Sequence, residues 1–267
     1  MSFMQTRCCG LRADSLTLIP VTRVLDKLDR YLAKKDFANA ERHLKYWLDE
    51  AKIKNDIRGE YAVCNELVGF YRKQGDKKNG LEFCDAVLRL TTAPVLADTV
   101  GCATGYLNTA TAYKSFGMPD RAIELYEKAR AIYEKTLDKD DDRFGGLYNN
   151  MALALCDLKR YDRAREMYGK AVSIMSNKEN GMLETAITYI NMAELEENAL
   201  GAEKAEGIIE KYLGEAEKYL FDGKVVKDGY CAYVYECCAP SFRYYGYFPV
   251  AQRLEKTANE IRQSIKE

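Results

Sequence analysis

The chain has 267 residues and a formal net charge of −1, because 40 Lys and Arg side chains nearly balance 41 Asp and Glu side chains. Proteins bind nucleic acids by neutralising phosphates, so this interspersed, balanced charge argues against a nucleic-acid partner. No run of 18 apolar residues occurs, which argues against a membrane-spanning helix.

Residues 1–20 are expected to form a flexible N-terminal tail. Their one apolar run, Leu16 to Ile19, is too short for the apolar region of a secretion signal. Nine cysteines occur without a Cys-x-x-Cys pair, and His43 is the single histidine, so neither a disulfide framework nor a zinc site is expected. We therefore expect a soluble cytoplasmic protein whose cysteines are mostly small buried side chains.

From residue 21 onward the chain is expected to form six helix pairs. Two of them align without a gap at an offset of 42 residues, which matches Tyr106 with Tyr148 and Asn108 with Asn150. Weaker copies extend this pattern in both directions. The expected pairs span residues 21–57, 58–98, 99–140, 141–181, 182–226 and 227–267.

The pair at 99–140 illustrates the pattern. Tyr106, Ala110 and Tyr113 fall at i, i+4 and i+7, which places them on one face of a helix. The segment Gly117-Met-Pro119 ends that helix, and a proline suits the first turn of the next one. Alanines at such positions let two helix axes approach to about 8 Å. Since one pair cannot bury its apolar stripe alone, the pairs must stack on one another.

Two positions depart from this pattern. Glu196 occupies a place where the repeat has an aromatic residue, and Pro240 falls inside the first helix of the last pair. A proline in a helix interior removes a backbone hydrogen bond, so we expect Pro240 to interrupt that helix.

The order of side chains resembles that of the tetratricopeptide repeat: bulky, small, aromatic on the first helix and small, aromatic, small on the second. The match covers roughly residues 21–267 and is strongest at 106–129 and 148–171. The period exceeds the usual length of about 34 residues, and it is similar to the longer repeats of kinesin light chains and of bacterial peptide-sensing regulators. The resemblance implies an all-α, right-handed superhelical solenoid of about six antiparallel helix pairs. In that family the concave face, lined by the first helix of each pair, binds extended peptides or partner helices.

Three asparagines occupy one position in consecutive pairs: Asn108, Asn150 and Asn191. An amide offers both the donor and the acceptor that an extended peptide backbone requires. Neighbouring helix axes lie about 8–10 Å apart, close to the length of three extended residues, so the three amides could hold one ligand. The resemblance favours this role, and the alternative is that each amide bonds the adjacent helix or faces water. The predicted peptide-binding residues are Asn108, Asn150, Asn191, Thr111, Lys73, Lys114, Asn149 and Glu194.

Charges near the predicted groove are unevenly distributed along the chain. A groove that is basic at one end and acidic at the other would orient a ligand more than it would tighten binding. Ordinary solvated helix faces are the alternative. The basic residues are Arg72, Lys73 and Lys114, and the acidic residues are Glu194, Glu197 and Glu236.

The sequence contains no convergent set of catalytic groups. The glycines near Arg143 lack the strand and the lysine of a phosphate-binding loop, and the acidic run 138–142 lacks the central glycine and the final glutamate of a calcium loop. The predicted function is a non-catalytic adaptor or scaffold that binds a protein or peptide segment without a cofactor or metal. A ligand-responsive regulator that lacks its own DNA-binding domain is the alternative. The partner and the oligomeric state stay open.

Overall fold

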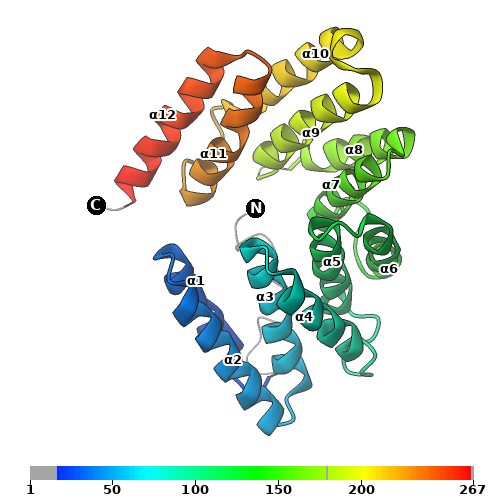
Figure 1. The fold of residues 1–267 in the computed structure, drawn as a ribbon, viewed down its shortest axis with the longest axis vertical. Helices are drawn as coiled ribbons and strands as arrows, with labels where there is room; N and C mark the ends of the chain where they lie inside the picture. Colours follow the sequence, from blue (N-terminus) through cyan, green and yellow to red (C-terminus); the bar gives the residue numbers. More distant parts are fainter. Residues whose placement is uncertain (1–16, 179, 266–267) are drawn as a thin grey trace. The chain divides into compact units, whose positions relative to one another are not determined.

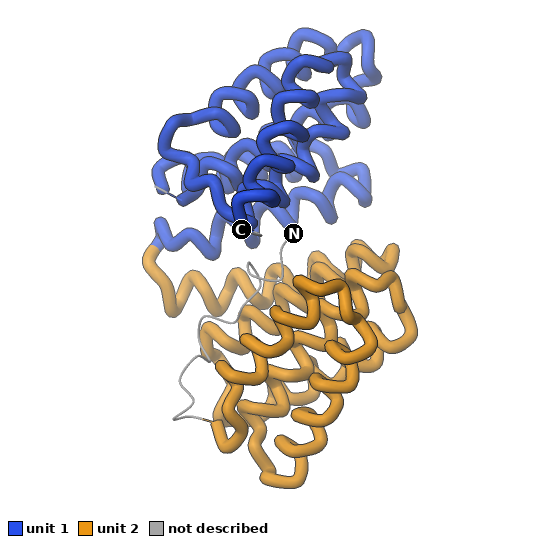
Figure 2. Tube along the Cα trace, turned by 90° about the vertical axis from the view of Figure 1, so that its left-hand side faces the viewer, with its two compact units in different colours: residues 1–2, 139–267 blue, residues 3–138 orange. Residues whose placement is uncertain are grey.

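The computed structural model describes residues 17–178 and 180–265, and within these stretches it has twelve helices and no strand. The chain divides into two compact units, of which one ends at Asp138 and the other begins at Lys139 (Figure 2). We call them the N-terminal unit and the C-terminal unit. Most of the predicted tail, residues 1–16, lies outside the described residues.

Each unit is built from helix pairs, so the expected all-α repeat fold is confirmed (Figure 1). In the part of the chain that the structure describes, no helix has the length and apolar composition needed to traverse a bilayer. The N-terminal unit contains α1 (Val21–Ala33), α2 (Phe37–Ile53), α3 (Ile57–Gln74), α4 (Lys77–Leu90), α5 (Val100–Ser115) and α6 (Pro119–Thr136). The C-terminal unit contains α7 (Asp142–Asp157), α8 (Tyr161–Met175), α9 (Met182–Leu200), α10 (Ala202–Leu220), α11 (Gly229–Tyr244) and α12 (Phe248–Ser264).

One turn recurs between consecutive helices of the N-terminal unit. The side chains of Asp36, Asp56 and Asp76 each accept a hydrogen bond from the backbone N–H three residues later. Such a bond satisfies a helix N–H that has no partner within the helix. The residue before each aspartate has a positive φ; these residues are Lys35, Asn55 and Gly75.

Asp56 also holds the segment that precedes α1. Its Oδ2 atom accepts hydrogen bonds from the backbone N–H groups of Leu18 and Ile19, at 2.6 and 2.9 Å. Its Oδ1 atom accepts from the N–H of Gly59 at 2.9 Å. A Cβ atom at residue 59 would lie 2.3 Å from this carboxylate and 2.7 Å from the Ile19 side chain. The glycine is therefore required by this close approach at the start of α3.

Alanines and tyrosines of the repeat form the contact between α5 and α6. Ala110, Ala122 and Ala129 have no exposed surface, and Tyr113 and Tyr126 are only 1% exposed. The small side chains allow the two helices to approach closely, and the rings fill the space beside them. The predicted stripes are thus the buried faces of this helix pair.

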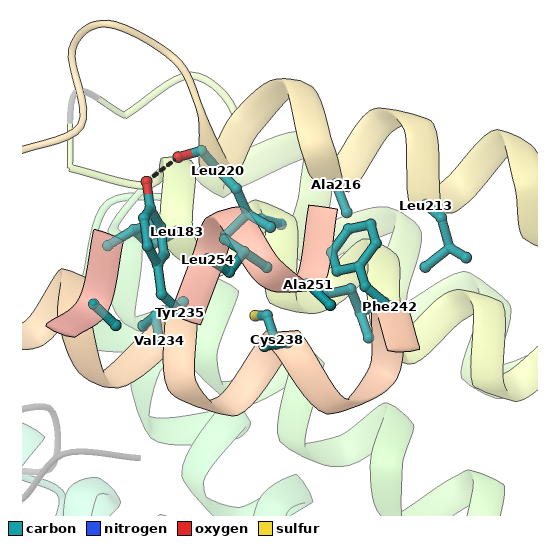
Figure 3. Close-up of a cluster of buried hydrophobic side chains, with 14 of the residues drawn as sticks. Leu183, Leu213, Ala216, Leu220, Val234, Tyr235, Cys238, Phe242, Ala251 and Leu254 are labelled. Carbon is teal, nitrogen blue, oxygen red and sulfur yellow. Dashed lines mark hydrogen bonds between the residues drawn. The ribbon is translucent and has the colours of Figure 1, made fainter. Parts of the chain in front are cut away.

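The C-terminal unit has its own hydrophobic core, part of which is shown in Figure 3. Phe242 of α11 lies near Ala216 of α10 and Ala251 of α12, so a large ring again packs where the neighbouring helices carry small residues (Figure 3). The hydroxyl of Tyr235 donates a hydrogen bond to the carbonyl of Leu220, where α10 ends. Ring packing and this bond together attach α11 to the pair before it.

Helix α11 continues through Pro240, so the expected interruption is wrong. The proline removes the N–H that the carbonyl of Glu236 would otherwise accept. Pro240 itself is exposed, whereas its neighbours Ala239 and Phe242 are buried in the core. We infer that the burial of this face outweighs the loss of one backbone hydrogen bond.

Candidate functional site

A small polar hollow lies between α3 and α5 of the N-terminal unit. The empty space between the lining side chains is about 360 Å³ when the open solvent in front of it is included, and little of it is enclosed. Helix α3 contributes residues spaced by one, three or four positions, which is the spacing of one helix face. The lining residues are Asn65, Glu66, Gly69, Arg72 and Lys73 of α3 with Asn108 and Thr111 of α5. We call this set the α3–α5 hollow.

Asparagine side chains connect the two walls of this hollow. The Nδ2 group of Asn108 donates to Oδ1 of Asn65 at 3.2 Å, and Nδ2 of Asn65 donates to the carbonyl of Tyr61 at 3.0 Å. Asn108 is 8% exposed, and its Oδ1 atom is buried without a hydrogen-bond donor. Buried acceptors of this kind are uncommon in proteins and costly to leave unpaired. Asn108, one of the lining residues, therefore has a buried acceptor whose hydrogen-bonding capacity is unused.

The hydroxyl of Thr111 on the same wall is already engaged. Its Oγ1 atom donates to the carbonyl of Leu107 at 2.9 Å and lies 3.1 Å from the hydroxyl of Tyr126. These bonds fix the rotamer of the threonine and attach α5 to α6. Thr111 therefore contributes shape to the hollow, while Asn108 contributes the acceptor.

Two partly buried cations complete the hollow. Burial lowers the pKa of Lys73 to about 7, and repulsion by Arg72 adds to this effect, whereas attraction by Glu66 opposes it. Burial also lowers the pKa of the Arg72 guanidinium. Both shifts mean that positive charge is poorly solvated here. A nearby negative charge would be favourable in such a site.

The C-terminal unit repeats the asparagine contact between α7 and α9. The Nδ2 group of Asn191 donates to Oδ1 of Asn149 at 3.2 Å. The hydroxyl of Thr188 lies 3.2 Å from the same oxygen and is shared with the carbonyl of Glu184 at 2.8 Å. Both asparagine contacts therefore join the first helices of neighbouring pairs.

The predicted binding residues are thus distributed over both units. Lys73, Asn108 and Thr111 lie together in the α3–α5 hollow, and Lys114 follows on α5, where it is half-buried. In the C-terminal unit, Asn149 and Asn150 of α7 are buried. On α9, Asn191 is half-buried and Glu194 is exposed.

Two lining residues, Asn65 and Gly69, are absent from the predicted binding set. Asn65 lies one position before Glu66, which the 42-residue offset aligns with Asn108, and Asn149 lies one position before Asn150, which the sequence alignment of the repeats pairs with Asn191. Asn65 and Asn149 are two repeats apart, so an asparagine recurs at this position in every second helix pair. The signal in the sequence is therefore a pattern with twice the repeat period.

Acidic residues of the C-terminal unit are largely paired with side chains of the same unit. Glu197 accepts hydrogen bonds from the hydroxyls of Tyr244 and Tyr245, both at 2.8 Å. Glu236 accepts two bonds of 3.1 Å from Arg262. These contacts favour ordinary surface pairing for Glu197 and Glu236.

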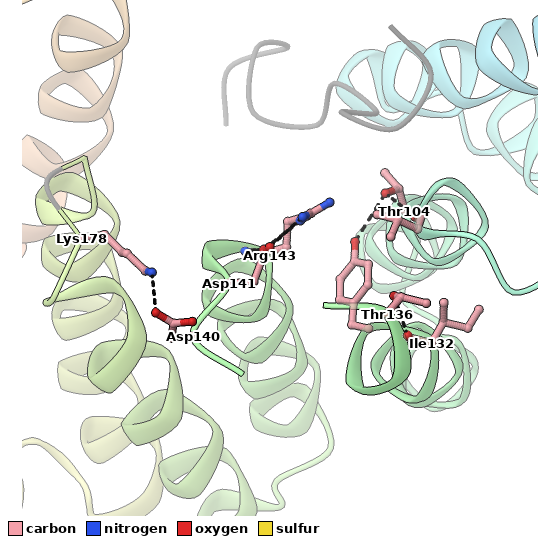
Figure 4. A network of polar contacts seen from close by, with 9 residues as sticks. Thr104, Ile132, Thr136, Asp140, Asp141, Arg143 and Lys178 are labelled. Atoms are coloured by element: carbon pink, nitrogen blue, oxygen red, sulfur yellow. Dashed lines mark hydrogen bonds and ion pairs between the residues drawn. The ribbon is translucent and has the colours of Figure 1, made fainter. Parts of the chain in front are cut away.

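The acidic loop before α7 is also occupied by local contacts (Figure 4). Asp141 caps α7 and accepts bonds of 2.8 and 2.6 Å from the Arg143 guanidinium, which holds the pKa of Asp141 below its usual value. Asp140 lies 3.2 Å from Nζ of Lys178. Across the described stretches of the chain, no group of three or more His, Cys, Asp or Glu side chains is arranged to hold a metal ion.

Comparison with known proteins identifies the repeat. Two family models, each described as a tetratricopeptide repeat, match residues 62–135 and 146–176. Among solved structures, BtubC (BKLC) from P. vanneervenii is 19% identical, with a TM-score of 0.55 over 87% of this chain and 92% of that one. A protein of nearly identical TPR-like repeats from Podosopora anserina is 16% identical, with a TM-score of 0.52 over 76% of this chain and 95% of that one. At these identities the likeness concerns the fold alone. No curated protein sequence matches the chain.

Proposed function

This chain belongs to the tetratricopeptide-repeat family, and from that premise we propose that it is a non-catalytic cytoplasmic adaptor that holds a segment of another protein in the α3–α5 hollow. Repeats of this family indicate a protein-interaction adaptor or scaffold in general. The proposal adds two points that are specific to this chain: the position of the binding site and the kind of chemical group that the site would bind.

The observation that carries the proposal is the buried Oδ1 atom of Asn108. Asn108 lines the hollow, and its buried Oδ1 atom has no donor within the protein. An extended segment presents backbone N–H groups at regular intervals, and one of them would satisfy this acceptor. A buried hydrogen bond that replaces an unpaired acceptor is worth about 1–3 kcal/mol. That is a sizeable share of a micromolar binding free energy of about 8 kcal/mol.

Each unit also has further proposed contact residues of its own. Lys114 follows Thr111 by three positions on α5, so it would meet the segment where it leaves the hollow. In the C-terminal unit the exposed Glu194 and the half-buried Asn191 are the proposed contacts. Asn149 and Asn150 are buried there, and their proposed role is to position Asn191 and its helix.

Gly69 provides a direct test. It lines the hollow, and an added Cβ atom meets nothing within 4 Å. A photo-cross-linking amino acid at residue 69 therefore enters the hollow without disturbing α3. Gly207 on α10 has the same open surroundings and serves as the matched control.

In lysate, the variant labelled at residue 69 is expected to cross-link to one segment of a partner protein, mapped by mass spectrometry. The same segment should be absent when the label is at residue 207. Equal labelling from both positions, or none from residue 69, would show that the hollow is not the contact site.

A further inference from the structure

We propose that three tyrosines of the C-terminal unit bind an arginine side chain of a basic partner segment. They are Tyr189 of α9 with Tyr212 and Tyr219 of α10, and we call them the tyrosine cluster. The ring centroid of Tyr189 lies 6.0 Å from that of Tyr212 and 5.9 Å from that of Tyr219. The inference goes beyond the proposed function, because it does not depend on the α3–α5 hollow.

The repeat itself shows what binds over such a ring. Tyr106, Tyr148 and Tyr189 occupy one position in consecutive first helices, each two residues before one of the three recurrent asparagines. The Nζ atom of Lys128 lies 5.8 Å from the ring centroid of Tyr106, and that of Lys170 lies 5.7 Å from the ring centroid of Tyr148. The negative face of an aromatic ring attracts such a cation. Two consecutive helix pairs therefore place a lysine of their own over the equivalent ring.

The α9–α10 pair has a ring at the position of that lysine. In the two preceding pairs the lysine stands eleven positions after a turn residue with a positive φ, Gly117 or Lys159. The corresponding turn residue before α10 is Gly201, with a φ of 83°, and the residue eleven positions after it is Tyr212. The cation of the repeat is thus replaced by a second aromatic side chain, which enlarges the surface that can receive a cation from outside.

The charge of this helix pair favours a cationic ligand. Residues 182–220 contain nine Glu and three Lys, without Asp or Arg. Glu215 falls between Tyr212 and Tyr219 on one face of α10. Burial raises the pKa of Tyr189, and Tyr219 and Glu215 add to this effect, so the carboxylate is close to the cluster. Its contact with Lys218 at 2.6 Å is a surface ion pair, which contributes little. The excess negative charge attracts a basic segment and repels the phosphates of a nucleic acid.

Arginine suits the cluster better than lysine does. All three rings are half-buried against the hydrophobic core, and a guanidinium is planar and more weakly hydrated than an ammonium group, so it stacks on such rings at a lower cost. This chain shows the difference. The guanidinium carbon of Arg121 lies 4.1 Å from the ring centroid of Tyr113, and that of Arg253 lies 3.7 Å from the ring centroid of Phe221. Both distances are shorter than those of the two lysines.

The test is NMR of the full chain with ¹³C in the tyrosine rings. The resonance of Tyr219 is the one that disappears in Tyr219→Phe. One probe is the peptide Gly-Gly-Arg-Gly-Gly, and the other carries citrulline, which has nearly the shape of arginine without its charge. We expect the arginine peptide to shift the Tyr219 resonance and the citrulline peptide to leave it unchanged.

Two substitutions locate the site. Tyr212→Lys restores the lysine of the two preceding pairs, so the chain should cover Tyr189 with its own cation and bind the arginine peptide at least about fivefold more weakly. Circular dichroism checks that this variant stays helical. Lys218→Ala releases Glu215 and should strengthen binding about twofold relative to Lys204→Ala, which removes the same charge from the start of α10.

Four outcomes would overturn the inference. They are no shift of Tyr219 with the arginine peptide, an equal shift with the citrulline peptide, an affinity of Tyr212→Lys equal to that of the parent, and equal affinities of Lys218→Ala and Lys204→Ala. The first two would leave the tyrosine cluster as packing between α9 and α10. None of the four bears on the cross-link from residue 69, so this site and the α3–α5 hollow are tested separately.

Discussion

The guanidinium group of Arg165 on α8 donates two hydrogen bonds of 2.8 Å to the carboxylate of Glu196 on α9. Glu196 is only 4% exposed, and the pair raises the pKa of Arg165 above its ordinary value. This contact accounts for an acidic residue at a place where the repeat has an aromatic ring. The two charges occupy that space together and join consecutive helix pairs of the C-terminal unit.

Removing the cation of this pair should therefore be costly. Arg165→Ala leaves a buried carboxylate without its partner, and because Arg165 is partly exposed we expect a loss of about 2–3 kcal/mol. Lys211→Ala removes an exposed cation from α10 and should change stability by less than about 0.5 kcal/mol. Urea unfolding of both variants checks this. Similar small effects would mean that Glu196 tolerates the loss of its partner.

Close packing at the repeat alanines can be tested at Ala152, which has no exposed surface. Ala152→Leu should destabilise the chain by about 1–3 kcal/mol, because the added atoms must push α7 away from its neighbours. Ala131 of α6 is exposed, so Ala131→Leu is the matched control. Thermal melts in which both substitutions are neutral would refute the close contact at Ala152.

The turns between helices predict a pair of opposite effects. Lys159 has a φ of 57° and Gly117 a φ of 75°, in the region that costs a side chain about 1–2 kcal/mol. Lys159→Gly should therefore raise stability by about 0.5–1 kcal/mol, and Gly117→Ala should lower it by about 1 kcal/mol. Denaturation midpoints measure both. Destabilisation by Lys159→Gly would contradict the left-handed turn.

The contact between Asn149 and Asn191 predicts coupling. In a double-mutant cycle, Asn149→Ala and Asn191→Ala should deviate from additivity by about 0.5–1.5 kcal/mol, which is the net value of one hydrogen bond. The control cycle pairs Asn149→Ala with Asn198→Ala, an exposed site on α9. Additive free energies in the first cycle would show that the asparagines do not stabilise the contact between α7 and α9.

Lys73 should make stability depend on pH. Between about pH 7 and its ordinary pKa of 10.5, the unfolded chain keeps a proton that the folded chain has released. The contribution of Lys73 to the free energy of unfolding therefore rises with pH across that window. Lys73→Met removes the half-buried charge, so its gain in stability should be larger at pH 6 than at pH 9. A gain that grows with pH in urea unfolding would contradict the lowered pKa.

The strongest repeats made the fold predictable. Alanines and tyrosines at a constant offset determine which faces of α5, α6, α7 and α8 are buried, and those faces are buried in the structure. The effect of Pro240 does not follow from the repeat pattern, because it depends on how much apolar surface the rest of α11 buries. Glu196 depends likewise on Arg165, which lies on another helix.

The candidate site was only partly predictable. Lys73, Asn108 and Thr111 follow from helix spacing, since each falls on the polar face of a first helix. The bond between Asn65 and Asn108 does not, because the two residues lie 43 positions apart, and the repeat is 42 residues long. The lowered pKa of Lys73 arises from burial, which a sequence pattern does not measure.

The most direct test of the account is the affinity of the cross-linked partner segment for a chain whose hollow is filled. Gly69→Phe places a ring in the hollow without a clash at Cβ, and Gly207→Phe adds the same ring on α10. By isothermal titration calorimetry at pH 6, Gly69→Phe should weaken binding by at least about tenfold, the equivalent of one buried hydrogen bond. Gly207→Phe should bind as the parent does. Equal affinity of all three proteins would contradict the assignment of the α3–α5 hollow as the binding site.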